Sequence, residues 1–145
     1  MGNIDWERIE NLRAAGRFVY GFSLDEDNVF FLQDFTQADF VHDANTGARF
    51  HFAASGLGDE VFLAGEFNGW QQIQMGRAPR VSTQFGLSLP LSRFAGTGKQ
   101  FKFVANGHLW IEPPDFASNV ADAGLGDPST RNLVLVEATD SSRSI

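Results

Sequence analysis

Residues 61 to 70 read Val-Phe-Leu-Ala-Gly-Glu-Phe-Asn-Gly-Trp. The apolar run from Val61 to Phe67 has the length and composition of a buried β-strand. The pair Asn68-Gly69 strongly favours a tight turn, because both residue types tolerate positive φ. This stretch therefore predicts a strand that enters a tight turn and carries Trp70 just beyond it.

The same order of features returns at residues 100 to 110, which read Gln-Phe-Lys-Phe-Val-Ala-Asn-Gly-His-Leu-Trp. A predicted strand, Gln100–Val104, is followed by a turn at Asn106-Gly107 and then by Trp110. The two tryptophans of these units lie forty residues apart. Both follow tight turns, where core tryptophans are uncommon, so Trp70 and Trp110 are candidate binding residues.

Other short strands surround these two units. Phe50 and Phe52 alternate with polar neighbours and predict a half-buried strand, and the turn at Ser55–Asp59 predicts that it pairs with Val61–Phe67. Further strands are expected at Phe85–Leu91 and Asn132–Val136. Several short strands with frequent turns, in a chain of 15 Phe, 3 Trp and 1 Tyr, predict an all-β antiparallel sandwich.

The N-terminal part of the chain is less regular. Residues Ile4–Ala15 predict a short amphipathic helix that ends before Gly16, and Trp6 on this helix is expected to pack in a core. A hairpin is expected from Phe18–Phe22 and Val29–Phe35, separated by a polar turn. We therefore predict three segments: a helix and extension packed on the domain (1–45), the sandwich (46–137) and a flexible tail (138–145).

Composition narrows the classes of partner. The 145 residues suit one principal domain, and 18 acidic against 11 basic residues give a net charge of −7. That charge repels phosphate backbones and anionic lipid, so neither nucleic acid nor a membrane is an expected partner. The chain shows no secretory signal and no apolar run long enough to span a bilayer, and it lacks cysteine. We expect a soluble protein, located in the cytoplasm.

On these motifs the chain resembles carbohydrate-binding module family 48, the isoamylase N-terminal type of domain that is also the glycogen-binding domain of AMP-activated kinase β subunits. The resemblance covers about residues 47 to 137. The family strand Val-x-Leu-x-Gly-x-Phe-Asn-x-Trp matches at every named position from Val61 to Trp70, and its second block matches at Phe101-Lys102-Phe103, Gly107 and Trp110. The resemblance implies an immunoglobulin-like (early set) β-sandwich that binds α-1,4-linked glucan.

By position, the resemblance assigns sugar contacts to Trp70, Lys102, Trp110 and Asn132. Arg131 stands where the kinase-subunit type has the first of two asparagines that hold the sugar. Either Arg131 supplies hydrogen-bond donors in its place, or that sugar contact is lost. Without the resemblance, Lys102 is equally well explained as a solvated lysine, because alternation turns it away from Phe101 and Phe103. The expected partner is an α-1,4-glucan, together with a glucan-active catalytic domain or a regulatory subunit.

The sequence shows no constellation that favours catalysis. The three histidines are scattered without ligand spacing, the glycines at 56 and 58 lie between strands, and Asp25-Glu26-Asp27 reads as a solvated turn. We therefore expect no enzyme activity, metal or cofactor in this chain. The alternative function is a packing or protein-interaction domain of a glycoside hydrolase family 13 type enzyme or regulatory complex, which binds no sugar of its own.

Overall fold

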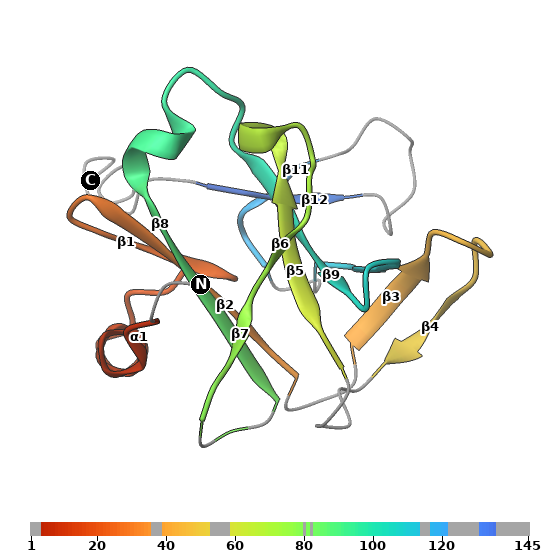
Figure 1. Ribbon diagram of the computed structural model, residues 1–145, viewed down its shortest axis with the longest axis horizontal. Helices are drawn as coiled ribbons and strands as arrows, with labels where there is room; N and C mark the ends of the chain where they lie inside the picture. The colour runs from red at the N-terminus through yellow and green to blue at the C-terminus, as the bar shows by residue number, and fades with distance from the viewer. Residues whose placement is uncertain are drawn as a thin grey trace.

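The computed structural model describes residues 4–35, 39–52, 59–79, 81, 83–113, 117–121 and 131–135. Two antiparallel sheets and one short helix make up this part of the chain, which confirms the predicted all-β sandwich (Figure 1). The smaller sheet has four strands, in the order β1 (Phe22–Asp25), β2 (Asn28–Asp34), β8 (Gln84–Pro90) and β7 (Gly76–Arg77).

The larger sheet is built around β9 (Gln100–Ala105). One edge of β9 pairs with β5 (Val61–Gly65), which also pairs with β6 (Ile73–Gln74). The other edge pairs first with β12 (Asn132–Val134) and then with β10 (Leu109–Ile111). The remaining strands extend this sheet on both sides: β11 (Val120–Ala121) lies beside β12, while β3 (Asp39–Asp43) and β4 (Arg49–Phe52) follow β10. Two 3₁₀ helices, η1 (Glu66–Asn68) and η2 (Leu91–Phe94), follow β5 and β8.

An aromatic core fills the space between the two sheets. Every second residue of each strand points into it, as the two-residue period of a strand requires. Phe101 of β9 lies at its centre, with its ring centroid 5.3 Å from that of Phe31 and 5.9 Å from that of Phe22, both in edge-to-face contact. Phenylalanines, which make up most of the aromatic residues of the chain, therefore hold the two sheets together.

The helix α1 (Trp6–Ala14) covers the other face of the smaller sheet (Figure 1). Ile9 and Leu12 are buried against Phe30 and Leu32 of β2, and Trp6 packs on the same cluster, as predicted. The smaller sheet is thus covered on both faces, whereas one face of the larger sheet has no helix over it among the described residues. No helix in the described ranges has the length and apolar character needed to cross a membrane.

Gly86 of β8 is the point where α1 rests on the smaller sheet. A Cβ atom at this position would lie 2.8 Å from Trp6 Cη2 and 3.1 Å from Ile9 Cδ1. We expect Gly86→Val to lower the free energy of unfolding by about 1–3 kcal/mol, because the helix must move away. Urea unfolding measures this, with Ser88→Ala on the same strand as a control that should change little. A Gly86→Val protein as stable as the wild type would show that the helix does not need this close approach.

The N-terminal residues contribute more to the sandwich than the predicted boundaries suggest. The expected hairpin is present as β1 and β2, although Ser23–Asp25 belong to a strand and the turn shrinks to Glu26-Asp27. Strand β2 pairs with β8 along its whole length, and β3 pairs with both β4 and β10. Residues before 46 therefore supply strands to both sheets, as well as the helix. The tail at 138–145 lies outside the described residues.

Two expectations about β4 are wrong. It pairs with β3 and not with β5, because β9 and β10 lie between β5 and the β3–β4 hairpin. Its Phe50 is also 38% exposed instead of buried, while Phe52 reaches the core. The reason is position: β4 is the last strand of its sheet, where the smaller sheet no longer covers the inner face.

Candidate functional site

The predicted site residues lie on the side of the larger sheet that faces away from the core, called here the outer face. Phe101 and Phe103 of β9 point into the core, so the alternation of side chains turns Lys102 and Val104 to the outer face. The same argument holds for each neighbouring strand. The outer face carries Phe62 of β5, Lys102 and Val104 of β9, Trp110 of β10 and Asn132 of β12.

Trp70 reaches this face through the turn that follows β5. The helix η1 ends at Asn68, and the next two residues, Gly69 and Trp70, both have left-handed backbones, with φ of 72° and 68°. A left-handed tryptophan is uncommon and costs conformational energy, here offset in part by the bond from Trp70 N–H to the Gly65 carbonyl at 2.8 Å. Asn68 holds the turn predicted at Asn68-Gly69 by donating to the Gln71 carbonyl at 2.9 Å.

The two predicted tryptophans are in contact. The ring centroids of Trp70 and Trp110 lie 6.4 Å apart, and their planes are inclined by 62°. Both residues are partly exposed. Val104, between Phe62 and Trp110 in the ladder, is fully buried although it faces away from the core. The indoles therefore belong to an apolar surface that begins at β5 and ends at β10.

Lys102 lies next to this surface and is only 6% exposed. Burial lowers the pKa of its ammonium group to about 8, while the carboxylate of Glu112 acts in the opposite direction and Arg131 lowers the pKa further. The lysine is thus close to two charged groups, one directly after β10 and one directly before β12. The expectation of a solvated lysine on the sheet surface is wrong, because the neighbouring side chains cover it.

Glu112 is the buried carboxylate of the outer face, with a side chain 6% exposed. Both of its oxygens accept from Arg49 Nε, at 2.9 and 3.1 Å. Asn132 Nδ2 donates to Gln100 Oε1 at 2.8 Å, and Arg131 Nη2 donates to the Pro113 carbonyl at 3.4 Å. These bonds fix the polar side chains around Lys102 before any ligand arrives.

The sheet register therefore gathers all five predicted residues in one region. Trp70 and Trp110 touch each other, Lys102 and Asn132 share the outer face, and Arg131 lies near Lys102. Sequence reasoning missed Glu112, Arg49 and Phe62, which belong to the same surface. The only available signal for Glu112 was its place two residues after Trp110, which puts it on the outer side of β10.

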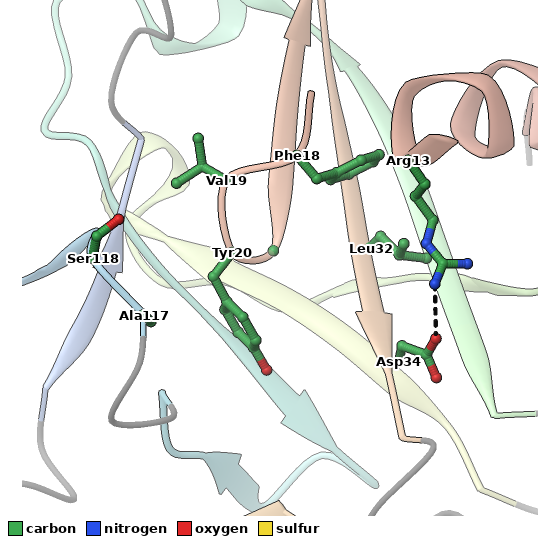
Figure 2. Close-up of a pocket in the computed structure, with 9 residues that line it drawn as sticks. Arg13, Phe18, Val19, Tyr20, Leu32, Asp34, Ala117 and Ser118 are labelled. Atoms are coloured by element: carbon green, nitrogen blue, oxygen red, sulfur yellow. Dashed lines mark ion pairs between the residues drawn. The ribbon is translucent and has the colours of Figure 1, made fainter. Parts of the chain in front are cut away.

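A separate cavity lies near the helix, away from the predicted residues. It has a volume of about 430 Å³ and is lined by Arg13, Phe18, Val19, Tyr20, Gly21, Leu32, Asp34, Ala117 and Ser118. Figure 2 shows Arg13 and Asp34 facing each other on one side, 3.6 Å apart between Nη2 and Oδ2.

The Tyr20 hydroxyl at this cavity donates to Gln33 Oε1 at 3.5 Å, and Gln33 Nε2 donates to Asp39 at 3.3 Å. Burial raises the pKa of Tyr20 to about 12, so its hydroxyl keeps its proton. Burial, together with the neighbouring Asp34, raises the pKa of Asp39 to about 6. The cavity thus offers a neutral phenol and an ion pair, but none of the residues that the motifs single out.

Comparison of the chain with family models, with curated proteins and with solved structures finds no match. Within the part of the chain that the structure describes, no three His, Asp or Glu side chains are grouped so that they could hold a metal ion. The functional argument therefore depends on the geometry of the outer face itself.

Proposed function

We propose that this chain is a non-catalytic module that binds α-1,4-glucan on the outer face of its larger sheet, in the manner of an immunoglobulin-like carbohydrate-binding domain. Trp70 and Trp110 stack on pyranose rings, while Lys102, Asn132 and Arg131 pair with hydroxyl groups. The observation that carries the proposal is the contact between the two indoles beside this polar group. We also propose that the module acts in the cytoplasm, and that its partner there is a glucan-active enzyme or a regulatory subunit.

The chemistry of the surface suits a sugar. A pyranose ring presents flat faces of C–H groups that pack on indole, and its rim of hydroxyls needs donors and acceptors. The inclination of 62° between the indoles matches a curved ligand better than a flat one, and α-1,4 linkages make a glucan chain curve. Rings fixed by a turn and a strand lose little side-chain entropy on binding.

A second function has its own support. Phe62 is partly exposed next to Val104, on the side away from Trp110, so the apolar area is wider than two indoles. Lys102 is also buried, and it must move before it can donate to a ligand. A packing domain that meets a catalytic domain or partner subunit would use the same surface without binding sugar.

Tryptophan fluorescence during titration with maltoheptaose separates the two functions. We expect a saturable change for the wild-type protein, and the same change in Trp6→Phe, because Trp6 belongs to α1 and packs on the smaller sheet, not on the outer face. Cellohexaose, whose β-1,4 chain is straight, should produce a much smaller response. An unchanged spectrum up to millimolar maltoheptaose would rule out the glucan site and favour the packing domain.

A further inference from the structure

One cross-strand row of residues runs over the outer face through six strands. Each member is the direct register partner of the next, and alternation places all of them on the same side of the sheet. In order, from β6 through β5, β9, β10 and β3 to β4, the row is Gln74, Phe62, Val104, Trp110, His42 and Arg49. At a strand spacing of ~4.8 Å, the row spans ~24 Å across the strands.

The end of the row beyond Trp110 is polar. Arg49 accounts for most of this character: its side chain is 49% exposed, its Nε binds Glu112, and neither of its Nη atoms has a hydrogen bond within the described residues. His42 lies between Trp110 and Arg49, and its Nδ1 is buried without a hydrogen-bond partner in the same part of the chain. A turn of the imidazole ring would bring that nitrogen to the surface, where a hydroxyl can pair with it.

Arg49 is held in place by two further contacts. Its guanidinium carbon lies 3.8 Å from the centroid of the Phe40 ring, and the ring of His51 lies 3.8 Å from the same centroid. Together with the bond to buried Glu112, this stack fixes the direction in which the Nη atoms point. A fork of two N–H groups in a fixed position suits two adjacent hydroxyls of one sugar ring.

We propose that the glucan lies across the strands along this row, and that Arg49 and His42 form an additional sugar subsite beyond Trp110. This inference rests on the proposed function and names the ligand more closely. Trp110 and Arg49 are two strand spacings apart, about 10 Å, which a single pyranose ring cannot bridge. A ligand that stacks on both Trp70 and Trp110 and also reaches Arg49 needs at least three glucose units, so the module selects longer oligosaccharides over maltose.

The test compares Arg49→Lys with the wild type, using maltoheptaose and maltose as ligands in calorimetric titrations. Lysine keeps a positive charge for Glu112 but lacks the fork of donors. We expect about tenfold weaker binding of maltoheptaose, the effect of losing one charge-assisted hydrogen bond, and less than a twofold change for maltose. Arg93→Lys is the matched control, since Arg93 also lies over an aromatic ring, Phe67, but belongs to η2 and is not a member of the row.

Two outcomes would overturn the inference, and they differ. If the wild type binds maltoheptaose and Arg49→Lys binds it equally well, the additional subsite is wrong and the proposed function stands. If the wild type binds neither sugar, the proposed function fails and the subsite fails with it. His42→Phe keeps an aromatic ring without its nitrogens. This variant should likewise weaken the binding of maltoheptaose more than the binding of maltose. Circular dichroism of each variant confirms that it is folded.

Discussion

Replacing Trp110 by alanine, or Trp70 by glycine, should weaken maltoheptaose binding at least about thirtyfold, the effect of removing a central aromatic contact of about 2 kcal/mol. Glycine is the sharper choice at 70, because it removes the indole and also relieves the left-handed backbone at φ 68°. The two indoles touch, so the double variant should lose less than the sum of the single losses. Calorimetric titration measures all three affinities.

Phe50→Ala is the matched control for these variants. Phe50 is an exposed aromatic residue of the same sheet, but its alternation places it on the inner side, opposite Val41. Phe50→Ala should leave the affinity for maltoheptaose unchanged. It shows whether the loss of any aromatic ring from this sheet is enough to weaken binding. Folded Trp70 and Trp110 variants that bind maltoheptaose as tightly as the wild type would refute the assignment of both residues.

Lys102 should make the stability of the protein depend on pH between about 8 and 10.5. Its pKa is about 8 in the folded chain and 10.5 for an ordinary lysine. Over this interval the unfolded chain holds a proton that the folded chain has released, so stability rises with pH, by about 3 kcal/mol in total. Below pH 8 both states are protonated, and the folded state carries the full cost of its buried charge.

Lys102→Met tests this directly, because methionine fills similar space without a charge. The difference in unfolding free energy between this variant and the wild type should favour the variant at pH 7 and shrink as the pH approaches 10. Taking the difference cancels Tyr20, whose raised pKa of about 12 has the opposite sign above pH 10. Lys99→Met, which removes an exposed lysine, should keep the wild-type dependence. A constant difference for Lys102→Met would mean that Lys102 keeps an ordinary pKa.

Sequence patterns predicted the strands that carry several apolar residues, either in a run or in alternation with polar ones. Gln100–Val104 and Phe85–Leu91 agree with β9 and β8 to within one residue at each end. The patterns missed β3, which reads Asp-Phe-Val-His-Asp, because only Val41 of this strand faces the core. They also missed β6, β7 and β11, since strands of two residues have no period to detect.

The candidate site was predictable for the two indoles and, through the family resemblance, for Lys102, Asn132 and Arg131, but not for the side chains that surround Lys102. Trp70 and Trp110 stand at fixed places after turns, so motif and alternation together locate them. Arg49 and Glu112 are 63 residues apart in the chain and meet only through the register of β10, β3 and β4. No local pattern specifies that register, and the burial of Lys102 follows from the same long-range pairing.

The pairing of β2 with β8 also bears on how the protein is made. Asp34 pairs with Gln84 and Asn28 with Pro90, so this ladder closes a loop of about fifty residues or more. The hairpins β1–β2 and β3–β4 can form as soon as they leave the ribosome, but the smaller sheet must wait for residue 90. Until then β2, which is apolar on both faces from Val29 to Leu32, has neither β8 nor the aromatic core against it. The nascent chain therefore exposes this apolar strand while about fifty further residues are made, and chaperone capture during synthesis should fall on this hairpin.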